Sequence, residues 1–258
     1  MQSVIKKFEP ISLAELNSKA ELMDRKDNKY ILSSDELKEF LYSIIDEFYI
    51  LEIDGKREFD YVSNYLDTDG FKTHRDHNQN RRRRYKIRYR SYAQTDKHFF
   101  EVKLKGFRNS TQKYRVNLTK DEITTSPNES LKRFFLSTLN SHYTDLSLPE
   151  LKQSIRVDYR RFTLVSKEQE ERITIDNNIT YYDDQNIIAL DPHRWIIEVK
   201  SPDLSTPSDA KLRSMGLRSV SLCSKYCIGI NLLKYPKVNN RFSPIIRKYF
   251  QNFHTKVA

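Results

Sequence analysis

The sequence predicts an α+β fold in which a large antiparallel sheet closes into a β-barrel that is flanked by helices. Two observations lead to this fold class. Several segments alternate charged and apolar residues with a period of two, which is typical of strands that bury one face. Other segments repeat apolar residues at intervals of three and four, as on one side of a helix. No internal repeat or low-complexity linker interrupts the chain, so we expect one domain over residues 1–258.

The strands are predicted from this alternation. From Arg84 to Arg90 it is strict: four cations share one face, and two tyrosines and an isoleucine share the other. It is less regular at the adjacent Arg160 and Arg161, which must point to opposite faces unless a bulge intervenes. The expected strands cover residues 61–68, 84–90, 99–105, 113–118, 154–165, 172–176, 179–182 and 194–200.

The helices are predicted from apolar stripes. Within residues 34–47, Phe40, Leu41 and Ile44 form such a stripe, and Ser34 is suited to cap the N-terminus of this helix. A turn is expected at Asp69-Gly70, followed by a polar connection at 74–80 for which a helix is left open. The expected helices cover residues 12–23, 34–47, 127–139, 208–215, 221–232 and 243–253.

The composition indicates a folded protein with an anionic partner. The 258 residues include 16 Tyr and 14 Phe, which supply enough apolar surface for a core. The net charge is +10, from 45 Lys and Arg against 35 Asp and Glu. No apolar stretch reaches the roughly eighteen residues that a membrane span needs, so direct membrane insertion is not expected. The two cysteines, Cys223 and Cys227, make no disulfide framework, which favours a reducing, cytoplasmic location.

The positive charge is concentrated on predicted strands. Residues 81–90 carry seven cations in ten positions, and further cations follow on the later strands. If the sheet closes with these faces inward, they line a channel that is costly when empty and favourable around a chain of phosphates. Arginine suits phosphate oxygens, and Glu101 and Glu198 on the same faces are typical of carboxylates that hold a divalent metal against phosphates. With five glycines and no Gly-x-x-x-x-Gly-Lys loop, phosphate recognition is expected to use side chains.

Nine short motifs follow one another along the chain. They are RKDNKY (25–30), YLDT (65–68), KIRYR (86–90), EVKLK (101–105), KYRV (113–116), YRR (159–161), RITID (172–176), IEVK (197–200) and SKY (224–226). In this order they resemble the polyphosphate polymerase domain of the vacuolar transporter chaperone (VTC) family, in the triphosphate tunnel metalloenzyme (CYTH-like) superfamily. The resemblance covers a core of about residues 25–232. Phe162-Thr163-Leu164 departs from the Thr-Ala-Phe type of run that is more frequent in the family.

The resemblance implies an antiparallel triphosphate tunnel and an enzyme that uses ATP with Mn²⁺ or Mg²⁺ to lengthen inorganic polyphosphate. It implies catalytic phosphate ligands at Lys29, Arg88, Arg90, Lys103, Arg161 and Arg172. It implies further substrate-binding cations at Lys105, Lys113, Arg115, Lys200 and Lys225. Glu198 resembles the metal ligand, Glu101 is a second candidate, and Asp67 is expected to pair with a cation of the tunnel. His74 and His77 lie three apart without a third ligand nearby, so they are not expected to bind zinc.

Two alternatives to the polymerase stay open. The same cations and metal would serve a triphosphatase that hydrolyses tripolyphosphate or nucleoside triphosphates, although the repeated Glu-x-Glu elements of the hydrolytic branch are missing. A non-enzymatic module for polyphosphate or nucleic acid is the other alternative, because tyrosines interleave the cations at 84–90. Nucleic acid is disfavoured as a partner, since Glu101 and Glu198 would repel its backbone. The sequence leaves open whether a membrane partner receives the product.

Overall fold

In the computed structural model, the chain forms two compact units. The first unit comprises Met1–Phe59, Tyr159–Ile179 and Leu190–Cys223, and the second comprises Asp60–Asp158, Thr180–Ala189 and Ser224–Ala258. The strands β8 (Lys152–Ser166) and β9 (Arg172–Tyr182) contribute residues to both units. That the whole chain is one domain stays a prediction. The described residues are 1–19, 26–105, 111–143, 149–202, 205–235 and 240–250, with the backbone alone at 253–257.

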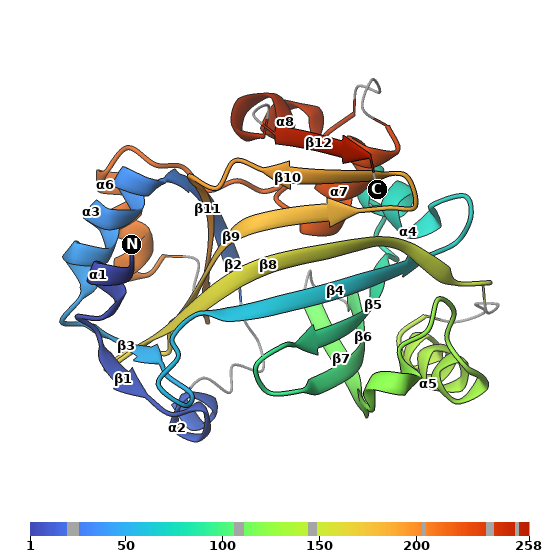
Figure 1. Ribbon diagram of the computed structural model, residues 1–258, viewed down its shortest axis with the longest axis horizontal. Coiled ribbons are helices and arrows are strands. Elements are labelled where there is room, and N and C mark those ends of the chain that lie inside the picture. The colour runs from blue at the N-terminus through green and yellow to red at the C-terminus, as the bar shows by residue number, and fades with distance from the viewer. Residues whose placement is uncertain are drawn as a thin grey trace. The chain divides into compact units, whose positions relative to one another are not determined.

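The first unit is built on a mixed sheet. Its parallel pair joins β1 to β3, whereas β3–β8, β9–β11 and β11–β2 are antiparallel. The strand order is β1 (Glu9–Ile11), β3 (Phe48–Leu51), β8, β9, β11 (Arg194–Ser201), β2 (Lys26–Ser33) (Figure 1). The two end strands, β1 and β2, are not paired with each other in the described part of this unit, so its sheet is open.

Helices cover one face of the first unit's sheet. The helix α3 contacts both α1 and α6 (Figure 1). Its N-terminus is closed by a capping box, in which Ser33 Oγ accepts from the Glu36 N–H and the Glu36 carboxylate accepts from the Ser33 N–H. Phe40 and Trp195 belong to the core between these helices and the sheet. The helices of this unit are α1 (Gln2–Ile5), α2 (Leu13–Lys19), α3 (Ser34–Ile44) and α6 (Pro207–Ser214).

The second unit contains an antiparallel meander. Strands β4, β5, β6 and β7 follow one another in the sheet in chain order, and each pairs antiparallel with the next. The full order is β12 (Phe253–Val257), β10 (Asn186–Leu190), β9, β8, β4 (Phe59–Asp67), β5 (Tyr85–Tyr92), β6 (Lys97–Lys105), β7 (Thr111–Leu118) (Figure 1). Here too the described end strands, β7 and β12, are not paired with each other.

One face of this meander packs on a helix, and a second helix packs on β8 and β9. Phe100, Val102 and Leu104 form a core with α5, so the odd-numbered residues of β6 point the other way. Gly229 of α7 approaches the sheet so closely that an added Cβ would lie 2.5 Å from a ring carbon of Tyr181. The remaining elements are α4 (Lys72–Asn78), the 3₁₀ turn Lys120–Glu122, α5 (Glu129–Asn140), α7 (Lys225–Leu233) and α8 (Ser243–Tyr249).

The predicted fold class, α+β with a large antiparallel sheet flanked by helices, is confirmed. The sheet is not closed into the expected barrel, since its described end strands, β7 and β12, are not paired with each other.

Two local predictions were wrong. The N-cap of α3 is Ser33 instead of Ser34. The expected strands at 172–176 and 179–182 form one strand, β9, which continues through Asn178 although this residue has a φ of 49°. The polar connection at 74–80, for which a helix was left open, is mostly the helix α4.

The helix expected at 12–23 ends at Lys19 within the described residues, and its last positions lie outside them. The described helices include none that is both long and apolar enough to cross a membrane.

Candidate functional site

A cluster of charged side chains in the first unit centres on Glu198. This Glu198 cluster consists of Lys29, Thr174, Glu198 and Lys200. Strand β11 lies between β2 and β9, and its register sets Glu198 opposite Lys29 on one side and opposite Thr174 on the other. Lys200 Nζ lies 2.6 Å from Glu198 Oε2 and donates to Thr174 Oγ1 at 3.1 Å. Lys29 Nζ lies 3.6 Å from Glu198 Oε1, so one carboxylate is shared by two ammonium groups.

The two lysines of this cluster have opposite pKa shifts. Burial is the largest single effect and disfavours the charge on Lys29, but the combined attraction of Glu198, Cys223 and Asp27 outweighs it and raises the pKa of Lys29 above its usual value. Burial lowers the pKa of Lys200 to about 8, and Glu198 offsets only part of the combined effect of burial and repulsion from Arg161 and Arg172. A bound polyanion would relieve this repulsion.

The two arginines nearest to the cluster have different surroundings. Arg161 makes a bidentate ion pair, in which Nε and Nη2 donate to the two carboxylate oxygens of Asp176 at 2.5 and 2.7 Å. Asp176 is 1% exposed, so it fixes the Arg161 guanidinium from the protein interior. Arg172 lies opposite Lys200 in the register and is half-buried. Arg160 is exposed, as the alternation around this pair of arginines requires.

A second cluster, in the second unit, surrounds a buried carboxylate. This Glu101 cluster consists of Tyr65, Arg88, Arg90, Glu101 and Lys113. Glu101 is 1% exposed, and Arg88 donates to its Oε2 from Nε at 2.8 Å and from Nη2 at 2.5 Å. Arg90 Nε lies 3.9 Å from the same oxygen, and Lys113 Nζ lies 3.7 Å from Oε1. Burial alone would raise the pKa of Glu101, but these cations, Arg88 foremost, hold it well below its usual range.

The meander places further cations beside the Glu101 cluster. Lys86, Lys103 and Lys113 lie opposite one another across β5, β6 and β7. Arg115 lies opposite Glu101, and its guanidinium lies 4.6 Å from the ring centre of Phe99. Cations therefore outnumber carboxylates on this face, as the alternation predicted. The two remaining predicted positions are Lys105, which lies opposite Thr111, and Lys225, the first residue of α7.

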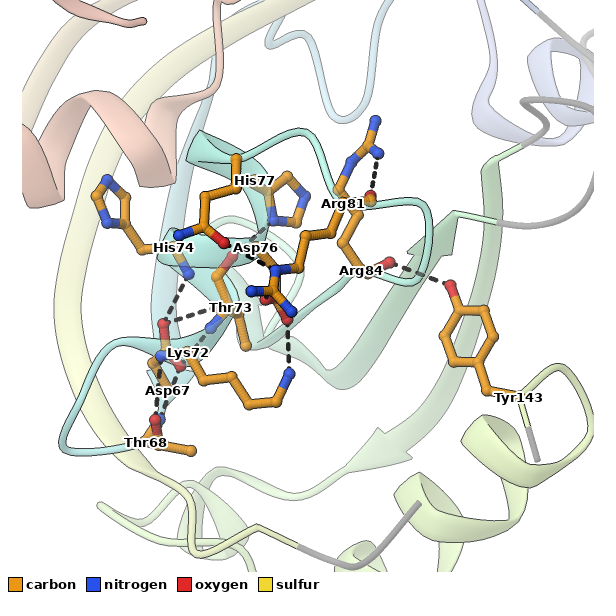
Figure 2. Close-up of polar contacts among 11 residues, drawn as sticks. Asp67, Thr68, Lys72, Thr73, His74, Asp76, His77, Arg81, Arg84 and Tyr143 are labelled. Atoms are coloured by element: carbon orange, nitrogen blue, oxygen red, sulfur yellow. Dashed lines mark hydrogen bonds and ion pairs between the residues drawn. The ribbon is translucent and has the colours of Figure 1, made fainter. Parts of the chain in front are cut away.

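The expectation that Asp67 pairs with a cation of the tunnel was wrong. Its carboxylate lies at the N-terminal end of α4 and accepts hydrogen bonds from the N–H groups of Thr68, Thr73 and His74 (Figure 2). It also accepts from the hydroxyls of Thr73 and Tyr226. The first N–H groups of a helix have no partner within the helix, and they determine where this carboxylate lies.

Comparison with known proteins identifies the family. A family model described as the VTC domain matches residues 24–234. The chain belongs to the VTC domain family. No curated protein matches this VTC domain. Its fold is similar to the solved structure of a candidate adenylate cyclase from Bacillus halodurans, with 13% identity and a TM-score of 0.50 over 82% of this chain and 100% of that chain.

A second solved structure resembles the VTC domain less well. It is a candidate adenylyl cyclase from Hippeastrum, described as having a dominant triphosphatase activity. The identity is 12% and the TM-score 0.43, over 80% of this chain and 95% of that chain. The family match confirms the resemblance predicted from the nine motifs, and the similarity to the first of these structures agrees with the expected fold.

The carboxylates of the VTC domain are suited to a divalent metal ion that the protein and the substrate phosphates bind together. No group of three or more His, Cys, Asp or Glu side chains able to hold a metal ion occurs among the residues with described positions. Mg²⁺ and similar ions, however, are often held by one or two carboxylates together with substrate phosphates. The Glu198 side chain is 17% exposed, whereas that of Glu101 is enclosed by its arginines. Glu198 therefore fits such a shared metal site better, and both metal assignments stay predictions.

Three residues in or beside these clusters were not predicted as site residues. Asp176 holds Arg161, Thr174 accepts from Lys200, and Tyr65 accepts from Arg88 Nη1 at 3.1 Å. The motifs RITID and YLDT contain all three, so the signal was present. These three side chains hold predicted phosphate-binding cations in place, whereas the predicted site residues were the phosphate-binding cations themselves and glutamates that could bind a metal.

Proposed function

We propose that this VTC domain is a polyphosphate polymerase that transfers the γ-phosphate of ATP to the end of a polyphosphate chain, with Mn²⁺ or Mg²⁺. The observation that carries the proposal is the Glu198 cluster, a partly exposed carboxylate shared by two lysines on a strand face that also carries Arg172. Such a site offers cations to phosphate oxygens and one carboxylate to a metal. The family and the absence of Gly-rich phosphate loops agree with recognition by side chains.

The proposed reaction needs no covalent intermediate on the protein. A terminal oxygen of the polyphosphate chain attacks the γ-phosphorus of ATP and forms a new P–O bond. The bond from that phosphorus to the β–γ bridging oxygen breaks, and ADP leaves with the electron pair. In the first unit, Lys29, Lys200 and Arg172 hold phosphate oxygens and balance their charge. Arg88, Arg90 and Lys103 are proposed separately as phosphate ligands of the second unit. A divalent metal on Glu198 would neutralise charge on the transferred and leaving phosphates.

The remaining predicted ligands have supporting roles in this proposal. Arg161 is held by Asp176 and adds positive charge near Lys200. The remaining predicted cations of the second unit would bind further phosphates of the polyphosphate chain: Lys105, Lys113, Arg115 and Lys225. Glu101 keeps Arg88 and Arg90 in place rather than binding the metal.

The test is incubation with ATP and Mn²⁺, with product sizing on polyacrylamide gels and ³¹P NMR. The proposal requires ADP together with chains that lengthen with time. Release of ADP and orthophosphate without chains would instead establish the triphosphatase. Binding of polyphosphate with no ATP turnover would establish the non-enzymatic module.

Replacement of Glu198 by Gln tests the carboxylate. We expect Glu198→Gln to lower turnover by about a hundredfold or more, in line with the loss of a group that stabilises transition-state charge. Circular dichroism should show an intact fold. Glu171→Gln is the matched control, because Glu171 is a glutamate of the first unit whose carboxylate bonds to Ser208 instead of a lysine. Wild-type turnover in Glu198→Gln would remove Glu198 from the reaction.

A further inference from the structure

A chain of contacts in the second unit connects α7 to the Glu101 cluster. It starts at the Arg88 guanidinium, whose Nε and Nη2 are held by Glu101. The remaining nitrogen, Nη1, donates to the Tyr65 hydroxyl at 3.1 Å. The orientation of the guanidinium plane is therefore set from two sides, by Glu101 on β6 and by Tyr65 on β4.

Tyr65 is in turn held by Tyr226. Their rings stack with centres 4.9 Å apart at an interplanar angle of 28°. Both rings are buried, at 5% and 1% exposure, so neither is free to move into solvent. Ser154 Oγ also donates to the backbone carbonyl of Tyr65. A shift of the Tyr226 ring would thus displace the ring that receives Arg88.

Tyr226 is held by the Asp67 carboxylate, which is fully buried and accepts from the start of α4. Burial and the charge of Asp67 raise the pKa of the Tyr226 hydroxyl well above its usual value, so this hydroxyl remains a donor at neutral pH. The contact also joins the first turn of α7 to the end of β4. These positions are therefore fixed relative to one another by a charge-assisted hydrogen bond.

We propose that Tyr226 is a positioning residue, which through Tyr65 holds the Arg88 guanidinium in the orientation that binds phosphate. The proposal rests on the proposed role of Arg88 as a phosphate ligand. Tyr226 itself touches no substrate in this account. The loss of its hydroxyl lets the ring pair and the Arg88 guanidinium reorient, so phosphate binding weakens.

The test is a double-mutant cycle on Tyr226→Phe and Arg88→Ala, read by isothermal titration with inorganic tripolyphosphate. We expect Tyr226→Phe to weaken binding about threefold or more, within the range measured for coupled neighbours. In the Arg88→Ala background the same change should have no effect. Equal effects in both backgrounds would mean that Tyr226 acts independently of Arg88, and would overturn the proposal.

Tyr114→Phe is the control for loss of a tyrosine hydroxyl, since Tyr114 lies on the other face of the meander and bonds to Gln112 and His142. A second readout is the hydrogen exchange rate of the Arg88 Nε–H, measured by NMR without ligand. It should rise in Tyr226→Phe and not in Tyr114→Phe, and an unchanged rate would overturn the positioning role. Wild-type protein that fails to bind tripolyphosphate would refute the proposed function, while the exchange rate would still decide on Tyr226.

Discussion

Mild acid should destabilise the second unit through His77, a partly buried histidine of α4. Its Nδ1 lies 2.8 Å from the Thr73 carbonyl oxygen in α4, which places a hydrogen on Nδ1 (Figure 2). Burial is the main cause that lowers the pKa of His77 from 6.5 to about 2, and the nearby cations Lys86 and Arg84 add to the shift. The folded protein therefore keeps this imidazole neutral at pH values where the unfolded chain protonates it.

This difference in pKa determines the direction and the size of the change in the free energy of unfolding. Below pH 6.5 the unfolded chain binds one proton more than the folded protein, so the free energy of unfolding falls as the pH falls. Each pH unit removes about 1.4 kcal/mol, and between pH 7 and pH 5 the loss due to His77 is about 2 kcal/mol. The loss continues to build until the pH approaches the folded-state value of about 2.

The assay is urea unfolding followed by circular dichroism at several pH values between 7 and 5. His77→Asn retains a donor for the Thr73 carbonyl but cannot protonate, so its stability should fall by about 2 kcal/mol less than that of the wild type over this range. His193→Asn replaces an exposed histidine and serves as the control. Parallel loss of stability in the wild type and His77→Asn would refute the reasoning, as would NMR titration of the His77 imidazole near pH 6.5.

Three substitutions test the packing and the charge pairs by urea unfolding. Gly229→Ala should cost about 1–3 kcal/mol, because its Cβ would overlap the Tyr181 ring, and an unchanged midpoint would mean that α7 can move away freely. Ser33→Ala removes the side-chain cap of α3 and should lower the free energy of unfolding by about 1 kcal/mol. An unchanged free energy would mean that water replaces the cap. Asp176→Asn leaves the half-buried Arg161 without its charge partner and should cost about 3 kcal/mol or more; wild-type stability would show that this pair contributes little net energy.

The sheet faces could be predicted because the register preserves the alternation. Arg88 and Glu101 lie opposite each other on paired strands, and each of their chain neighbours points to the core, as period two requires. The short strands β1, β3 and β10 could not be predicted, since three to five residues are too few to show a period. Strand β2 has eight residues but no regular alternation, so it was not predicted either, and Lys29 was found by resemblance to the family.

Two local errors have different causes. Asn177 and Asn178 favour a turn, but strand pairing on both sides of them outweighs this propensity and keeps β9 continuous.

Asp67 was assigned to the cations of the sheet because a helix at 74–80 was left open and its start was not placed. The helix α4 begins at Lys72, and the N–H groups of Thr73 and His74 bind the Asp67 carboxylate.

The sharing of Glu101 by three cations also constrains how the sequence can vary. A change of Glu101 alone would leave the positive charges of β5 and β7 facing one another, and a change of Arg88 alone would leave a buried carboxylate poorly compensated. Neither single step is neutral, so evolutionary drift at these positions should proceed through compensated pairs. We therefore expect covariation between positions 88, 101 and 113 among VTC domains, even where the chemistry of their substrates differs.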